Sequence, residues 1–200
     1  SAGEDRIKGY TLGGYWTRYG EKEWYLDGVL QATWYKARAD SGRGLTPLKS
    51  DGLGLAASLE GGYPFVLENE WVIEPQAQLI YQWLDMDDSS DLGAEVRFDD
   101  MESLAGRLSA RLSRTWVDMD DPAEPLDTTG WARLSAWYEF LGEPITEFSS
   151  ATGFIPFHAD MGGGWGEIEL GLTSEFDRNR FIYANIGYQH GFDDDRHAWE

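Results

Sequence analysis

From Val72 to Trp83 the sequence alternates between two kinds of side chain, and this alternation constrains the fold more than any other feature. The even positions carry Val72, Glu74, Gln76, Gln78, Ile80 and Gln82, whereas the odd positions carry Ile73, Pro75, Ala77, Leu79, Tyr81 and Trp83. Successive side chains of a β-strand point to opposite faces. The segment is therefore predicted to be a strand with one apolar face and one polar face that carries a carboxylate.

Seven further segments show the same two-residue period, and turns rich in Gly, Asp, Glu, Asn and Pro separate them. They cover residues 9–19, 24–35, 53–63, 104–116, 131–140, 167–173 and 182–189. In residues 104–116 three arginines could instead line one face of a helix, but the leucines alternate strictly around Gly106, which favours a strand. The many Gly, Trp, Tyr and Phe residues are also typical of strands and turns. We therefore predict an all-β fold.

The composition excludes several classes of protein. A net charge of -20 argues against a nucleic-acid partner, because a negative surface repels phosphate. The absence of cysteine removes disulfides and thiolate metal sites. No apolar run approaches the roughly 20 residues of a membrane helix, whereas strands of a membrane β-barrel need only one apolar face. Residues 1–8 lack the apolar core of a signal peptide, so we expect a processed piece or a domain of a longer chain.

Charged and amide side chains fall on one face of the predicted strands. A hydrated lumen would tolerate them and let opposite charges pair, whereas a soluble β-sandwich would place them on its outer surface. The predicted lumen-facing residues are Asp27, Gln31, Glu60, Glu74, Gln76, Gln78, Arg107, Arg111, Arg133, Glu139, Glu167 and Glu169. The predicted lipid-facing residues are Leu26, Leu30, Leu55, Leu59, Leu79, Leu108, Leu134, Leu170 and Ile186.

The connections between the segments alternate in length. Residues 20–23, 66–70 and 177–179 form tight connections, residues 38–50, 84–100 and 142–162 form long ones, and residues 117–128 are out of step. Many aromatic residues also lie near the segment ends. Membrane barrels have short turns on one side, long loops on the other and aromatic girdles at both interfaces. The pattern favours an antiparallel up-and-down transmembrane β-barrel over a soluble sandwich.

No motif indicates enzymatic chemistry. The sequence has no Gly-x-Ser-x-Gly elbow, Walker loop or zinc spacing, and His158, His190 and His197 are isolated from one another. The acidic run from Asp85 to Glu95 lacks the central glycine and the register of an EF-hand, which favours a solvated loop. We predict no cofactor and no metal site.

Several motifs resemble the C-terminal translocator domain of pertactin- and AIDA-type autotransporters, which belong to type V secretion. They are Gly-Tyr-Thr-Leu-Gly-Gly-Tyr-Trp at 9–16, Trp-Tyr-Leu-Asp-Gly-Val-Leu-Gln at 24–31, Leu-Ala-Ala-Ser-Leu-Glu-Gly-Gly-Tyr-Pro-Phe at 55–65 and Glu-Pro-Gln-Ala-Gln-Leu at 74–79. The match continues through Phe98-Asp99-Asp100 to Arg111, Trp-Tyr-Glu-Phe-Leu-Gly at 137–142, Trp-Gly-Glu at 165–167 and Tyr-Ala-Asn-Ile-Gly-Tyr at 183–188.

The resemblance implies a twelve-stranded barrel in the bacterial outer membrane that exports an N-terminal passenger to the cell surface. It implies four partners, namely outer-membrane lipid, the protein's own passenger, a linker helix in the lumen and the barrel assembly machinery. Residues 1–200 would then be the β-domain truncated at both ends, because the linker helix, the first strands and the last strand are absent. Such a fragment is not expected to close the family's barrel alone, since unpaired strand edges are prohibitive in lipid.

Some members of the resembled family release the passenger by cleavage inside the barrel with lumenal carboxylates. Asp27, Glu60 and Glu74 are candidates for that role, although they could equally anchor the linker or pair with the arginines. Two other functions stay open, namely a passive porin-like channel and a soluble β-sandwich that binds carbohydrate. The identity of the passenger cannot be inferred. Within the predicted strand of residues 72–83, Pro75 lacks a backbone donor, so we predict a bulge or a broken hydrogen bond there.

Overall fold

The computed structural model describes residues 4–40, 48–90, 95–98, 100–118, 126–142, 145–150, 153–158, 162–177, 180–192 and 197–199. Long strands dominate these residues. They are β1 (Glu4–Tyr19), β2 (Tyr25–Asp40), β3 (Leu48–Gly62), β5 (Trp71–Met86), β8 (Met101–Asp118), β9 (Leu126–Glu139), β12 (Gly163–Asp177) and β13 (Arg180–Gly191). Each overlaps one of the segments predicted from alternation, to within one residue at Trp24, Tyr63 and Phe140, and the arginine-rich segment is strand β8 rather than a helix.

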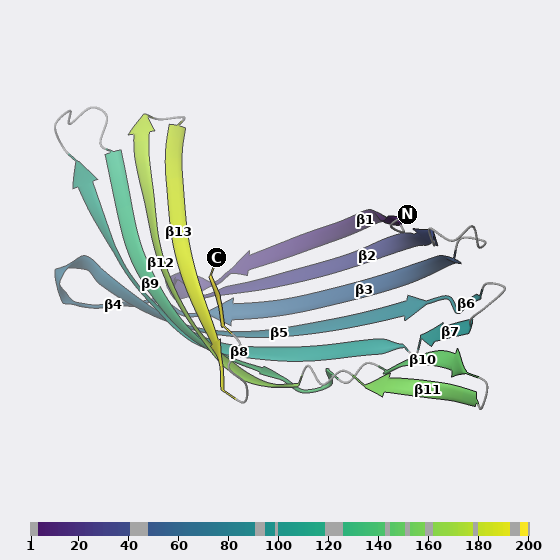
Figure 1. Ribbon diagram of the computed structural model, residues 1–200. Coiled ribbons are helices and arrows are strands. Elements are labelled where there is room, and N and C mark those ends of the chain that lie inside the picture. The colour runs from purple at the N-terminus through teal and green to yellow at the C-terminus, as the bar shows by residue number, and fades with distance from the viewer. Residues whose placement is uncertain are drawn as a thin grey trace.

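The long strands form one antiparallel sheet in the order β1-β2-β3-β5-β8-β9-β12-β13, and β14 (His197–Trp199) extends it beside β13. Sequence order and spatial order are the same, which is the up-and-down topology. The sheet curls into a half-barrel that is open between β1 and the edge formed by β13 and β14 in the described residues (Figure 1). The predicted all-β, antiparallel up-and-down fold is therefore confirmed. The β-sandwich alternative needs two sheets packed face to face, whereas the long strands here belong to one sheet.

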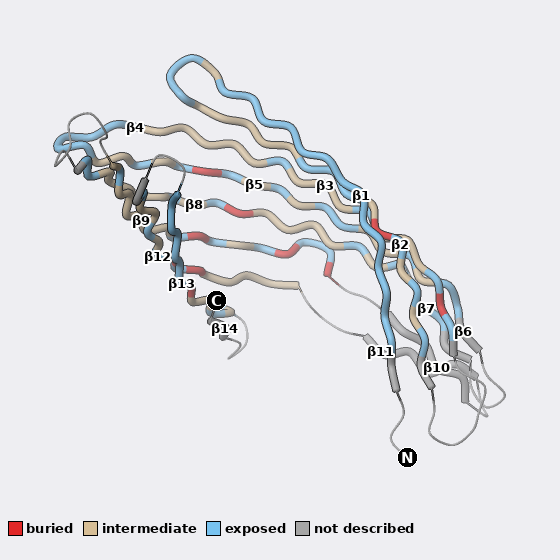
Figure 2. The backbone as a smooth tube through the Cα atoms, turned by 90° about the horizontal axis from the view of Figure 1, so that it is seen from above, coloured by how far each residue is buried: buried red, intermediate tan, exposed pale blue. Residues whose placement is uncertain are grey.

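The registers keep the apolar side chains of neighbouring strands on one face. Leu59 lies opposite Leu79, and Leu134 lies opposite Ile168. The sheet nevertheless has no packed apolar core within the described residues, where no side chain is less than 2 % exposed. Figure 2 shows the same result, with only short buried stretches along the strands. The apolar face is therefore left uncovered, which is the opposite of what a soluble β-protein does with its large apolar residues.

Two of the tight connections use the same local structure. The 3-10 turns η1 (Glu21–Glu23) and η2 (Glu68–Glu70) each lead directly into a tryptophan. In η1 both Lys22 and Glu23 have positive φ, and in η2 both Asn69 and Glu70 do. The sequences Glu-Lys-Glu-Trp and Glu-Asn-Glu-Trp thus encode two equivalent turns at the same end of the sheet.

The long connections contain strands that alternation did not predict. Residues 84–100 include β6 (Ser89–Ser90) and β7 (Glu95–Phe98), and residues 142–162 include β10 (Ile145–Ser150) and β11 (Gly153–His158). These strands form a second sheet in the order β11-β10-β7-β6. The predicted connection 38–50 is also too long, because β2 continues to Asp40 and β3 begins at Leu48. Residues 119–125, in the connection predicted to be out of step, lie outside the described residues.

Pro75 lies where the ladder on one side of β5 is interrupted. Strand β3 pairs with β5 only as far as Gly62 opposite Gln76, and β4 (Phe65–Val66) resumes the pairing opposite Ile73. Pro75 accepts a hydrogen bond from the Tyr63 amide at 3.2 Å, so its backbone nitrogen faces the same interruption. On the other side β5 pairs with β8 without a shift. The predicted break at Pro75 is confirmed on the β3 side.

Three glycines on the polar face lie beneath a large side chain of the neighbouring strand. Tyr25 covers Gly62, Trp131 covers Gly171, and Met86 covers Gly52, and each pair is also directly opposite in the register. A Cβ atom at any of these glycines would overlap the covering side chain. Glycine is therefore required here by close approach rather than by backbone conformation. The described residues contain no helix with the length and apolar character needed to cross a bilayer.

Candidate functional site

The registers gather the predicted lumen-facing residues into rows across the polar face. One row runs through Asp27, Glu60, Gln78 and Arg107 on β2, β3, β5 and β8. A second row runs through Glu74, Arg111, Arg133 and Glu169 on β5, β8, β9 and β12. Gln76 and Glu167 lie in the row between them. The structure thus brings most of these side chains together on one face.

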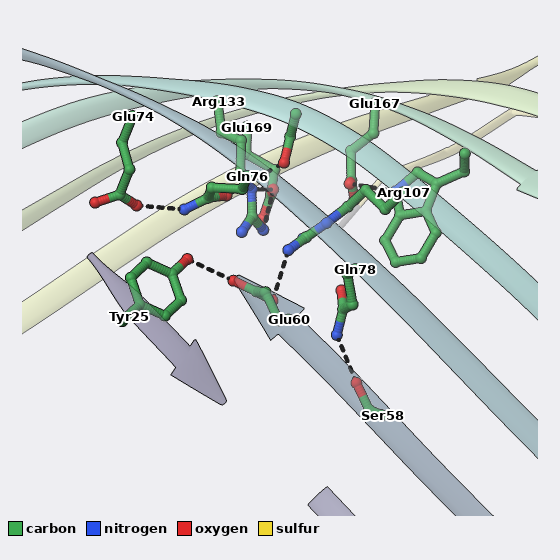
Figure 3. Close-up of polar contacts among 12 residues, drawn as sticks. Tyr25, Ser58, Glu60, Glu74, Gln76, Gln78, Arg107, Arg133, Glu167 and Glu169 are labelled. Atoms are coloured by element: carbon green, nitrogen blue, oxygen red, sulfur yellow. Dashed lines mark hydrogen bonds and ion pairs between the residues drawn. The ribbon is translucent and has the colours of Figure 1, made fainter. Parts of the chain in front are cut away.

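The centre of this polar face is an ion pair that spans a strand. Arg107 on β8 donates from Nη2 to Oε2 of Glu60 on β3 at 2.7 Å, across β5. Tyr25 donates its hydroxyl to the other oxygen of Glu60, also at 2.7 Å. The side chain of Arg107 is only 5 % exposed. Figure 3 shows Arg107, Glu60 and Tyr25 pointing toward one another from different strands. Side chains from strands that are not neighbours approach one another most readily on the inside of a curved sheet, so the polar face is the concave face of the half-barrel in Figure 1.

Aromatic rings pack against the cations of this face. The Arg107 guanidinium lies 5.2 Å from the centroid of the Trp137 ring, and Trp137 stacks on Trp165 with centroids 5.5 Å apart. Arg111 lies 5.2 Å from the centroid of Trp131. A cation over an aromatic face is attracted by the ring quadrupole, most strongly where water is scarce. The rings therefore position the arginines and shield one side of each guanidinium.

A second ion pair lies towards β12. Arg133 donates to Glu169, whose side chain is 8 % exposed. The neighbouring Glu167 accepts hydrogen bonds from Trp137 Nε1 at 2.9 Å and from Gln189 Nε2 at 3.0 Å. Each buried carboxylate is thus compensated by a cation or by neutral donors, as buried charges require.

The remaining polar residues form amide contacts or lie apart. Gln76 donates to Glu74 at 2.6 Å, and Gln78 donates to Ser58 at 3.0 Å. Glu139 accepts from the backbone amides of residues 104 and 141 and from Ser103, so it holds the end of β9 rather than the centre of the face. Gln31 is exposed and lies near the middle of β2. One carboxylate oxygen of Asp27 is buried without a hydrogen-bond partner.

The predicted lipid-facing residues occupy the convex face. Leu30 is 68 % exposed and Leu108 is 69 % exposed, and the others are exposed as well, except Leu26, which is half-buried. From Leu26 to Trp34 the convex positions of β2 are uncharged, a span of about 27 Å along the strand at about 3.4 Å per residue. With the strand tilt of a membrane barrel, about 35–45°, this span covers about 20 Å of membrane thickness, which is most of an apolar band about 25 Å tall. Contact of this face with lipid, and of the concave face with a lumen, stays a prediction.

Several residues of the site were not singled out from the sequence. They are Tyr25, Ser58, Trp131, Trp137 and Gln189. Alternation places Tyr25, Trp131 and Trp137 on the polar face, and an aromatic side chain among charged ones is the signal that could have found them. Alternation gives no information on which partners meet.

The geometry offers no arrangement for catalysis among the described residues. Glu60, the candidate carboxylate closest to the centre, is bound by both Arg107 and Tyr25. The residues described here also contain no group of three or more His, Asp or Glu side chains that could hold a metal ion. The side chains of His158 and His197 lie outside the described ones.

Comparisons with known proteins identify the family. The model of the autotransporter β-domain matches residues 1–189. The chain is 30 % identical over 191 residues to the adhesin BmaC autotransporter of Brucella suis, covering 92 % of this chain and 5 % of that protein. It is 28 % identical over 198 residues to the BrkA autotransporter of Bordetella pertussis, covering 94 % of this chain and 18 % of that protein. The chain thus spans less than a fifth of the length of these curated relatives.

A solved structure agrees with the sequence comparisons. The crystal structure of the β-domain of the Bordetella autotransporter BrkA superposes with a TM-score of 0.68 and 25 % identity. The superposition covers 99 % of this chain and 72 % of that one. Together with the curled amphipathic sheet, these matches show that the chain belongs to the autotransporter β-domain family and is a translocator domain of that family.

Proposed function

We propose that the protein containing this chain resides in the bacterial outer membrane and exports its own N-terminal passenger to the cell surface. The single observation that supports this most directly is the distribution of side chains on the curled sheet. Large apolar residues cover the convex face, while buried ion pairs and amides cover the concave face. A sheet of this kind is stable where lipid covers one face and water or a polar segment covers the other.

The concave face would contact the passenger's linker helix during and after export. The centre of the concave face offers hydrogen-bond donors, acceptors and aromatic rings. Their positions are fixed, because the ion pairs Arg107–Glu60 and Arg133–Glu169 restrain the side chains that form them. Asp27 adds a carboxylate oxygen that lacks a partner in the described residues and could accept a donor from the linker. Assembly into the membrane would require the barrel assembly machinery, because each strand must pair before it meets lipid.

Two arginine substitutions on strand β8 test the membrane assignment. Leu108 lies in the middle of the strand and Trp116 lies near its end, and both are exposed on the convex face. An arginine facing lipid costs about 2–4 kcal/mol at the bilayer midplane but about 0–1 kcal/mol near an interface. Leu108→Arg in the full-length protein should therefore strongly reduce surface display of the passenger on intact cells.

Trp116→Arg is the matched control, because it adds the same residue to the same face of the same strand. It should leave display largely intact, as measured by antibody labelling and protease shaving of whole cells. Equal display by the two variants would contradict the membrane assignment. Cooperative folding of the chain in buffer without detergent would contradict it as well.

We further propose that Glu60 and Glu74 anchor the linker rather than cleave it. Glu60 is held by a guanidinium and a phenol, and Glu74 accepts from an amide, so neither is poised to attack a peptide bond. Glu60→Gln, Glu74→Gln and Asp27→Asn should therefore leave passenger release unchanged, as followed by the size of the surface passenger on a gel. Loss of release in a variant that folds and displays normally would show that self-cleavage uses that carboxylate.

A further inference from the structure

Five cations gather at one end of the convex face, although the chain as a whole carries a net charge of -20. They are Arg6 and Lys8 on β1, Lys36 and Arg38 on β2, and Lys49 on β3, and all five are exposed. These five make up almost a third of the 16 Lys and Arg residues. We call them the cationic patch. Its position on the apolar face makes it distinct from the arginines of the concave face.

The register sets cations of the patch directly opposite one another. Arg6 pairs with Arg38, and Arg38 pairs with Lys49. In the next row Lys8 pairs with Lys36, and Asp51 follows on β3. Like charges directly opposite each other in a sheet destabilise it. The two rows thus concentrate positive charge in one area of the face, where a ligand with two anionic groups would contact cations of all three strands.

Aromatic and aliphatic side chains lie directly beside the patch on the same face. Tyr10 lies opposite Trp34 in the row after Lys8 and Lys36, and the two rings are 65 % and 48 % exposed. Leu12, in the following even position of β1, is 71 % exposed. Tyr and Trp prefer the level of lipid headgroups, with apolar residues deeper in the membrane. The cations therefore lie about 7 Å or more beyond the aromatic level, at about 3.4 Å per residue.

The patch lies at the end of the sheet that carries the long connections, the outer side in a membrane barrel. The same end of β5 and β8 is acidic, with Asp85, Asp100 and Glu102 exposed there. At this end β1–β3 carry the five cations beside Glu4, Asp40 and Asp51, so anions are attracted to this part of the rim more than to the acidic ends of β5 and β8. Phosphate esters are the anions found at this level of a membrane, and lysine and arginine are their usual partners.

We infer that the cationic patch binds a lipid of the outer leaflet whose headgroup carries two phosphates, with the acyl chains lying on Tyr10, Leu12 and Trp34. Two rows of cations match two phosphates, and the apolar residues beside them match the chains. The inference rests on the proposed outer-membrane location. A headgroup held in this way would also link β1, β2 and β3 at their outer ends.

The test titrates the full-length protein, extracted from outer membranes and delipidated in detergent, with lipid A that carries two phosphates. Parallel titrations use the same lipid without its phosphates and inorganic phosphate alone, and native mass spectrometry counts the bound molecules. Each cation removed near an anionic lipid should weaken binding about fivefold, so Lys8→Gln with Lys36→Gln should weaken it roughly thirtyfold. Replacing both lysines by arginine should preserve binding.

Arg18→Gln with Lys22→Gln is the matched control, because it removes two exposed cations at the opposite end of β1. This control should bind lipid A like the unmodified protein. Equal weakening by the two double variants, equal binding of the phosphate-free lipid, or competition by inorganic phosphate at the same affinity as lipid A would overturn the inference. The single variants Lys8→Gln and Lys36→Gln, each expected to weaken binding about fivefold, decide the question if the double variant does not fold.

Surface display of the passenger separates this inference from the proposed function. Variants of the patch should still display the passenger while they lose lipid binding. If those variants display the passenger normally and bind lipid A as well as the unmodified protein does, lipid binding by the cationic patch is refuted and the proposed export function is not. Absence of display by the unmodified protein would refute the proposed function and the inference with it.

Discussion

Removal of the Glu60 charge tests whether the strand-spanning ion pair stabilises the concave face. Glu60→Gln keeps the size of the side chain but leaves the Arg107 cation, with its side chain only 5 % exposed, without a carboxylate partner. Two unit charges 4 Å apart attract by about 4 kcal/mol at an effective dielectric constant of 20, and breaking a buried pair typically costs about 3–5 kcal/mol. The Glu60 side chain is 21 % exposed, so water screens part of this energy. We expect a loss of about 2 kcal/mol in the free energy of unfolding.

Arg107→Gln should cost more, about 3 kcal/mol, because it also removes the contact with the Trp137 ring. The double variant should cost about 3 kcal/mol rather than about 5, because the two side chains act on each other. The free energy of unfolding is measured for the unmodified protein, the two single variants and the double variant. Each full-length protein is refolded into vesicles and titrated with urea while its tryptophan fluorescence is followed. Glu74→Gln is a matched control that removes a carboxylate bound to the Gln76 amide, and it should cost less than about 1 kcal/mol.

Two outcomes would refute this account of the ion pair. One is a Glu60→Gln variant that loses less than about 0.5 kcal/mol, which would show that solvent already screens the pair completely. The other is a double variant whose loss equals the sum of the single losses, which would show that the two side chains do not interact.

Two backbone predictions follow from the registers. Gly62→Ala places a Cβ into the Tyr25 ring and should lower the free energy of unfolding in urea by about 1–3 kcal/mol. Gly61→Ala is the control, because its Cβ would have ordinary contacts at 3.5 Å, and it should cost less than about 1 kcal/mol. Similar losses in the two variants would show that the Tyr25 ring moves aside freely. Pro75→Ala should change stability by less than about 1 kcal/mol, because the ladder is already interrupted there. Ala77→Pro should lower the free energy of unfolding by about 3 kcal/mol, because residue 77 pairs with strands β3 and β8 and its amide points to the same side as the nitrogen of residue 75. Equal effects of Pro75→Ala and Ala77→Pro would contradict the assigned register.

Alternation predicts the strands and their faces well because each face meets a uniform environment. Leu108 and Arg107 are neighbours in the sequence, yet one is 69 % and the other 6 % exposed. A two-residue period is enough to separate them. The same signal weakens at the strand ends, where charged residues also occur on the convex face. Lys8, Lys36 and Lys49 therefore lay outside the predicted segments, and the cationic patch became visible only in the structure.

The partners within the concave face could not be predicted from alternation. The period assigns Glu60 and Arg107 to one face but does not set the stagger of β3, β5 and β8, which determines whether the two side chains meet. The second sheet was missed for a different reason. Its strands are two to six residues long, and Phe154, Ile155, Pro156 and Phe157 are consecutive apolar residues without a two-residue period.

The glycines beneath Tyr25, Trp131 and Met86 favour one pairing register of the strands over others. The alternation of polar and apolar residues alone is compatible with several registers. A slip of two residues between neighbouring strands keeps every polar side chain on its own face, so amphipathicity does not oppose it. Such a slip would move Tyr25 away from Gly62 and onto a residue with a side chain, where the ring has no room. The stagger of neighbouring strands sets the tilt and the radius of a curled sheet. The three covered glycines thus help to set how tightly the sheet curls.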